Sequence, residues 1–72
     1  NPKLAEEILS IIQKLSDRGI TILMVEHNIE AVMKISERVV VLAEGTVIAD
    51  GSPENIRKDD KVIEAYLGSG NE

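Results

Sequence analysis

Residues 20–43, ITILMVEHNIEAVMKISERVVVLA, decide the fold that the sequence predicts. The stretch contains two nearly apolar, β-branched runs, residues 20–25 and 38–43, and neither alternates with polar residues. That pattern indicates strands covered on both faces. Between them, Asn28 is a suitable cap for a helix with a buried side. Strand, helix and strand in this order predict a right-handed βαβ unit with parallel strands.

A helix is predicted before this unit. Apolar residues recur at helical spacing from Leu4 to Leu15, which indicates one buried stripe. Asn1 and Pro2 are typical of a helix start, because asparagine caps and proline is tolerated in the first turn. Gly19 is typical of the left-handed residue that ends a helix.

A hairpin strand and two short helices are predicted after it. Glu44 and Gly45 favour a tight turn into an antiparallel strand, residues 46–49. Ser52 is typical of a cap for a short helix, which residues 58–61 then interrupt. A last amphipathic helix is expected to end at Gly68, before a loose tail of residues 69–72.

Composition and charge exclude several classes of protein. The 72 residues carry 13 acidic and 8 basic side chains, a net charge of −5, so we expect no nucleic-acid partner. The absence of cysteine excludes a disulfide framework and a thiolate metal site. The apolar runs are too short to cross a bilayer, so we expect no direct membrane insertion. Since the chain begins without methionine, we expect a fragment or a processed chain.

His27, the only histidine, is the first candidate functional residue. It follows the predicted strand 20–25 and precedes the helix that Asn28 opens. Ligands of open parallel sheets lie outside the carboxyl ends of the strands. An imidazole there can donate a hydrogen bond to an oxyanion or a water. Position alone favours a simpler alternative, in which His27 only finishes the strand and bonds to nearby backbone.

Other chemistry near His27 is less well supported. Glu26 and His27 could form an acid–base pair, but adjacent residues of a strand point to opposite faces, so we expect a solvated Glu26. His27 and Glu30 are too few ligands for a metal ion, and we predict no metal site.

Three stretches carry a resemblance to a known family. Residues 19–56, GITILMVEHNIEAVMKISERVVVLAEGTVIADGSPENI, strongly resemble the C-terminal part of the ATP-binding subunit of ABC transporters. The pair NP at residues 1–2 is similar to the end of that family's D-loop. The ending VIEAYLG, residues 62–68, resembles the subunits that energise branched-chain amino acid uptake. The resemblance covers residue 1 to about residue 68.

The resemblance implies a fold and roles for a few residues. It implies a C-terminal fragment of an α/β P-loop NTPase domain, with residues 1–52 in the ATPase core and residues 53–72 in a C-terminal helical extension. His27 matches the switch histidine of the H-loop, which contacts the γ-phosphate and helps to orient the attacking water. Asn1 and Pro2 match the D-loop remnant that meets the second ATPase subunit, although helix capping is the simpler explanation for both.

The resemblance also implies what the chain cannot do alone. It lacks the phosphate loop G-x-x-x-x-G-K-[ST], the signature motif and the Walker B carboxylates. We therefore expect a transport ATPase in the parent protein, with ATP and Mg²⁺, and neither activity nor tight nucleotide binding in this chain alone. The implied partners are a second ATPase subunit, in an ATP-sandwich dimer, and transmembrane permease subunits. The implied location is peripheral, on the cytoplasmic side of the cell membrane.

Two alternatives from other classes stay open. The first is a non-catalytic α/β interaction module that binds a protein partner through the hairpin edge, residues 38–49, or through the last helix. The second is a small binder of phosphate ligands that uses only the helix start at residues 27–30.

Overall fold

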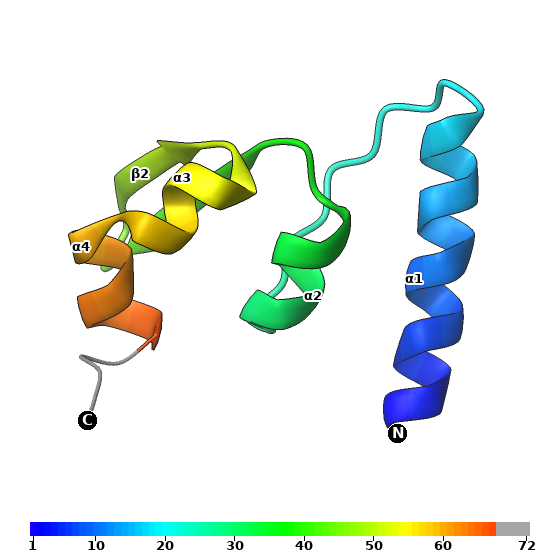
Figure 1. Cartoon of the computed structure of the whole chain (residues 1–72), viewed down its shortest axis with the longest axis horizontal. Helices are drawn as coiled ribbons and strands as arrows, with labels where there is room; N and C mark the ends of the chain where they lie inside the picture. Colours follow the sequence, from blue (N-terminus) through cyan, green and yellow to red (C-terminus); the bar gives the residue numbers. More distant parts are fainter. Residues whose placement is uncertain (68–72) are drawn as a thin grey trace.

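The computed structural model describes residues 1–67 and shows a mixture of helices with one two-stranded antiparallel sheet. The elements in chain order are α1 (Pro2–Asp17), α2 (Ile29–Ile35), β1 (Val39–Ala43), β2 (Thr46–Gly51), α3 (Pro53–Lys58), α4 (Asp60–Val62) and the π-helix η1 (Ile63–Leu67). In Figure 1 the hairpin, α3 and α4 lie together at one end, α1 lies at the other, and α2 lies between them. The predicted helix end at Gly68 and the tail of residues 69–72 lie outside the described residues.

The cap residues of α1 act as the sequence predicts. The Asn1 Oδ1 atom accepts hydrogen bonds from the backbone N–H groups of Lys3, at 3.0 Å, and Leu4, at 3.4 Å. Pro2 occupies the first turn, where its missing N–H costs nothing. Gly19 has a φ of 91°, a conformation that glycine adopts without strain, and it follows the end of the helix. The predicted helix is therefore confirmed at both ends.

The strand predicted for residues 20–25 is wrong for the described chain, and so is the parallel βαβ unit. This segment runs as an irregular connection between α1 and α2 (Figure 1). Leu23 and Val25 are 91% and 92% exposed. A strand needs a neighbour for its N–H and C=O groups and cover for its apolar faces. Residues 1–67 pair no strand with this segment, so its strong β propensity produces no sheet.

The predicted hairpin is confirmed, with a bulge. Glu44 and Gly45 have φ values of 52° and 76°, and the two-residue hairpin turn that matches strand twist requires positive φ at both positions. The register shifts between Val41, which faces Ala49, and Leu42, which faces Val47. The β2 strand therefore carries one residue more than β1 over this stretch, which defines a β-bulge.

The sheet is covered on one face only, which corrects the prediction for residues 38–43. Val39 and Val41 are buried, whereas Val40 and Leu42 are 47% and 53% exposed. Two layers of structure are needed to cover both faces of a sheet, and within residues 1–67 only one layer packs on the hairpin. The burial of β1 therefore alternates along the strand.

The core joins the hairpin to the helices on either side of it in sequence. Its buried members are Val39, Val41, Ile56 and Val62, and the partly buried residues packed against them are Val32, Met33, Ile48 and Ala49. These residues come from α2, both strands, α3 and α4. The core therefore fixes α2 relative to the hairpin, and α2 in turn carries the candidate site at its start.

Two caps shape the helices after the hairpin. The Ser52 hydroxyl accepts a hydrogen bond from the Asn55 N–H at 3.2 Å, which confirms the predicted cap of α3. Asp59 then ends α3 and caps α4, since its Oδ1 atom accepts from the N–H groups of Lys61, at 2.8 Å, and Val62, at 3.3 Å. The predicted interruption over residues 58–61 is therefore only one residue long, because one capping carboxylate is enough to restart a helix.

Candidate functional site around His27

The candidate site is a turn of three residues, 26–28, that leads from the irregular segment into α2. His27 lies directly before Asn28, the cap of the helix, as the sequence predicts. Its side chain is 99% exposed. No strand lies behind it in the described chain, so the imidazole projects from a loop and not from the end of a sheet.

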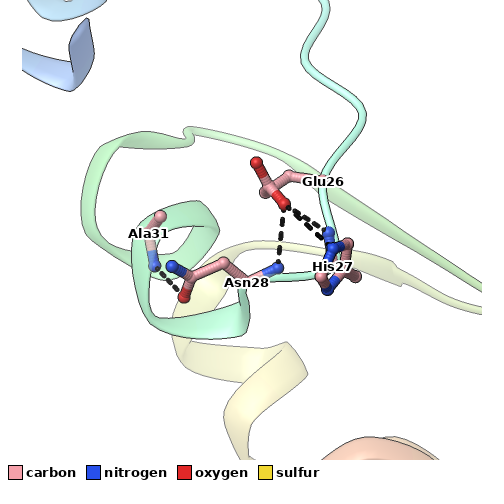
Figure 2. Close-up of polar contacts among 4 residues, drawn as sticks. All are labelled: Glu26, His27, Asn28 and Ala31. Atoms are coloured by element: carbon pink, nitrogen blue, oxygen red, sulfur yellow. Dashed lines mark hydrogen bonds and ion pairs between the residues drawn. The ribbon is translucent and has the colours of Figure 1, made fainter. Parts of the chain in front are cut away.

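The Glu26 side chain folds back over this turn. Its Oε1 atom accepts hydrogen bonds from the backbone N–H groups of His27, at 2.9 Å, and Asn28, at 3.3 Å (Figure 2). The His27 Nε2 atom lies 3.9 Å from the same oxygen. The prediction that Glu26 and His27 point apart is therefore wrong, because the alternation on which it relied holds only within a strand.

The turn keeps the Glu26 carboxylate ionised. The N–H of His27 lowers the pKa of Glu26 most, the N–H of Asn28 adds to this effect, and the nearby imidazole contributes least. Hydrogen bonds to the charged form of a carboxyl favour that form. A negative charge therefore lies beside the imidazole at neutral pH. The 3.9 Å separation between the Glu26 Oε1 and His27 Nε2 atoms is too long for a hydrogen bond.

The next residue ties the turn to the helix. The Asn28 Oδ1 atom accepts a hydrogen bond from the Ala31 N–H at 3.3 Å (Figure 2). The Asn28 backbone oxygen accepts a hydrogen bond from the Val32 N–H at 3.2 Å. Since Val32 packs against the core, its hydrogen bond to Asn28 connects the turn to the core. The backbone of residues 26–28 is thus held at both ends while the imidazole stays in solvent.

The other predicted site residues do not join this turn. Asn1 and Pro2 lie at the start of α1, where Asn1 is engaged as a cap. A hollow between α1 and α2 is lined by Leu9, Lys34 and neighbouring residues, and His27 does not line it. No group of three histidine or acidic side chains within residues 1–67 could hold a metal ion.

Sequence reasoning missed the role of Glu26. The signal that was available is its position two residues before a helix cap, where the chain must turn and backbone N–H groups lack partners. A side-chain oxygen near such a turn can accept hydrogen bonds from them, as the oxygens of aspartate and asparagine often do.

The described residues, 1–67, contain no helix that is long and apolar enough to cross a membrane.

Comparisons with known proteins agree on one family. The family model described as "Branched-chain amino acid ATP-binding cassette transporter" matches residues 46–71. The chain is 45% identical over 69 residues to the high-affinity branched-chain amino acid transport ATP-binding protein BraF of Pseudomonas aeruginosa, which covers 94% of the chain and 27% of BraF. The LivG protein of Escherichia coli, with the same description, matches with the same identity and coverage.

A less similar relative is named for the transport of a different substance, lipopolysaccharide. The lipopolysaccharide export system ATP-binding protein LptB of Haemophilus influenzae is 34% identical over 68 residues, which cover 94% of the chain and 28% of LptB. No solved structure matches the chain significantly. The chain spans about a quarter of the length of the curated relatives it matches.

The family model and the curated relatives are named for the same kind of transporter subunit. The family model covers β2 and the helices after it, and the match to BraF covers 94% of the chain. The chain is therefore a relative of the C-terminal part of the ATP-binding subunits of ABC transporters, of the branched-chain amino acid type.

Proposed function

We propose that this chain is part of an ATP-binding subunit whose ATP hydrolysis drives the import of branched-chain amino acids. The observation that carries the proposal is the 45% identity over 94% of the chain to BraF and LivG, whose names state this cargo. The relative named for lipopolysaccharide export is less similar, at 34% identity. ATP and Mg²⁺ are the proposed substrate and cofactor of the parent protein.

Within the parent protein, His27 acts as the switch histidine. Its ring is 99% exposed and so is free to meet a triphosphate that another segment holds. A neutral imidazole donates one hydrogen bond and accepts another, so it can contact the γ-phosphate and a neighbouring group together. The start of α2 holds the backbone beside it, which limits where the ring can go. The glutamate that would act on the attacking water is not in this chain.

The remaining roles follow from the same family assignment. Asn1 and Pro2 form the D-loop remnant that faces a second ATPase subunit in an ATP-sandwich dimer. Residues 1–52 belong to the ATPase core, and residues 53–72 form its C-terminal extension. Transmembrane permease subunits are the other partners, and the subunit acts peripherally on the cytoplasmic side of the membrane. The 72-residue chain alone neither hydrolyses ATP nor binds it tightly.

The test is His27→Ala in the intact parent subunit, assembled with its permease in lipid vesicles. ATP turnover should fall by about a hundredfold or more, as expected for loss of a group that acts on the reacting atoms. ATP binding should persist, because most phosphate contacts lie elsewhere. Glu30→Ala, which removes an exposed acid from the first turn of α2, is the matched control and should keep normal turnover. Normal turnover in His27→Ala would remove His27 from the mechanism.

Two further measurements address the cargo and the isolated chain. Vesicles that contain the intact transporter should accumulate leucine, isoleucine or valine when ATP is supplied, and uptake of an unrelated solute would contradict the proposed cargo. Titration of the 72-residue chain with Mg·ATP should give no tight binding. Tight binding there would instead support the alternative of a small phosphate binder.

A further inference from the structure

The Glu26 carboxylate is bound to the backbone of the turn that carries His27. One of its oxygens accepts from two successive backbone N–H groups, those of His27 and Asn28, at 2.9 and 3.3 Å. Neither N–H has a partner in a strand or a helix, since the turn lies between the irregular segment and α2. The carboxylate therefore supplies hydrogen bonds that secondary structure does not.

This arrangement restricts the backbone of the histidine. The N–H groups on both sides of the His27 α-carbon point to a single oxygen atom, so both of its backbone dihedrals are constrained (Figure 2). The direction in which a side chain leaves the backbone follows from those dihedrals. An exposed imidazole has no packing of its own to hold it, because its ring is 99% exposed. The turn is thus the only fixed support that the described residues give to the ring.

We propose that Glu26 is a positioning residue for His27: its carboxylate orders the turn of residues 26–28 and so directs the imidazole toward the nucleotide. This inference rests on the proposed role of His27. Positioning of the imidazole matters for the rate, because a misplacement of about 1 Å at a reacting group can cost about a hundredfold in rate. Glu26 does not touch the nucleotide itself, and its effect passes through the backbone.

The Glu26 carboxylate could also act on His27 by a second route, directly through its negative charge. The Glu26 Oε1 atom lies 3.9 Å from the His27 Nε2 atom, so the negative charge could act directly on the ring. The geometry favours the backbone route, because the two hydrogen bonds are shorter than that contact. The amide oxygen of glutamine accepts hydrogen bonds as a carboxylate does but carries no charge. Glu26→Gln therefore separates the two routes.

The experiment uses the intact parent subunit with its permease and measures kcat and KM for ATP. Glu26→Ala should lower kcat about tenfold and leave the KM for ATP within about twofold, since the loss concerns the reacting step and not nucleotide binding. Glu26→Gln should keep kcat within about threefold of the unmodified protein. Adding Glu26→Ala to His27→Ala should cause no further loss, because the two residues act as a unit. Glu30→Ala is again the matched control, because Glu30 is an exposed acid that bonds to neither N–H of the turn.

A second readout tests the turn without catalysis. In nuclear magnetic resonance spectra of the 72-residue chain, the amide resonances of His27 and Asn28 should shift together as the Glu26 carboxyl titrates. The midpoint should lie below the usual range of glutamate, as the lowered pKa of Glu26 requires. In Glu26→Gln this shared titration should vanish.

The outcomes separate the inference from the proposed function. If His27→Ala loses turnover and Glu26→Ala does not, the positioning role of Glu26 is overturned and the switch role of His27 stands. If Glu26→Gln loses as much as Glu26→Ala, the charge acts on the ring and the backbone route is overturned. If His27→Ala keeps normal turnover, the switch role of His27 and the positioning role of Glu26 fail together.

Discussion

The Tyr66 hydroxyl donates a hydrogen bond to the main-chain oxygen of Leu42, which lies 24 positions earlier in the chain. This bond joins the π-helix η1 to β1, beside the bulge where the hairpin register shifts. Tyr66 is 44% exposed, and its hydroxyl is engaged in this bond. The last helix is thus held to the hairpin by a polar contact as well as by the core.

Tyr66→Phe should lower the free energy of unfolding of the chain by about 1 kcal/mol, because it leaves the Leu42 oxygen without this donor and keeps the ring. Urea unfolding followed by circular dichroism measures the change. Thr21→Val is the control, since it removes an exposed hydroxyl that forms no side-chain hydrogen bond among residues 1–67. Equal stability of Tyr66→Phe and the unmodified chain would show that the bond adds nothing.

The hairpin turn should respond in opposite directions to changes at its two residues. Glu44 has a φ of 52°, which strains most side chains but suits asparagine, so Glu44→Asn should raise the free energy of unfolding by about 1 kcal/mol. Gly45→Ala should lower it by a similar amount through backbone strain, because no atom lies within 4 Å of the added methyl group.

Glu37→Asn is the matched control for the turn, because it removes the same charge from a position where φ is not positive. Thermal unfolding of all three variants under one set of conditions makes the comparison. A loss of stability in Glu44→Asn would contradict the assignment of a strained residue at this position.

The Arg38–Asp50 pair should make the hairpin sensitive to acid. Two nitrogens of Arg38 donate to the two carboxylate oxygens of Asp50, at 2.9 and 2.7 Å. These hydrogen bonds lower the pKa of Asp50, with the charge of Arg38 adding to them. The stabilisation is therefore complete above the pKa of unfolded aspartate, about 3.9, and is lost as the pH falls through the lower folded value.

In Arg38→Gln, the pKa of Asp50 should return toward its ordinary value, and carbon-detected resonance spectra of the carboxyl group measure it. Arg57→Gln is the control, since Arg57 forms no ion pair with Asp50 in the structure. An Asp50 pKa that does not move in Arg38→Gln would show that the pair is not formed in solution.

The irregular segment should make the isolated chain self-associate. Leu23 and Val25 are more than nine-tenths exposed, and apolar side chains gathered in this way favour contact with another surface. Sedimentation velocity should show species larger than the monomer as concentration rises. The double change Leu23→Lys and Val25→Lys should shift the chain toward the monomer. The control, Thr21→Lys with Thr46→Lys, adds the same charge without removing apolar surface, and equal effects in both would point to charge alone.

Local signals account for the parts of the fold that sequence predicts well. Asn1, Asn28 and Ser52 each cap the helix that follows them, and Glu44 with Gly45 forms the hairpin turn. Each of these effects depends on hydrogen bonds or dihedral preferences within about four residues. No distant part of the molecule is needed to produce them, so the sequence alone predicts them.

The candidate site was predicted in position but not in geometry. The place of His27 before the cap Asn28 follows from the order of residues. The contact of Glu26 with the turn does not, because it requires that the segment leave the extended conformation that its composition favours. The wrong prediction of a strand at residues 20–25 therefore led to the wrong prediction that the side chains of Glu26 and His27 point apart.

By itself, the sequence determined the helix starts, the turn of the hairpin, the family and the position of the single histidine, because all of these depend on residues close together or on the order of residues. Only the tertiary structure decided which apolar runs become strands. Residues 39–43 find a partner in β2 and cover from the core, whereas residues 20–25 find neither within residues 1–67. A strand is stable only when a neighbour satisfies its backbone and buries its side chains, and composition alone does not specify that neighbour.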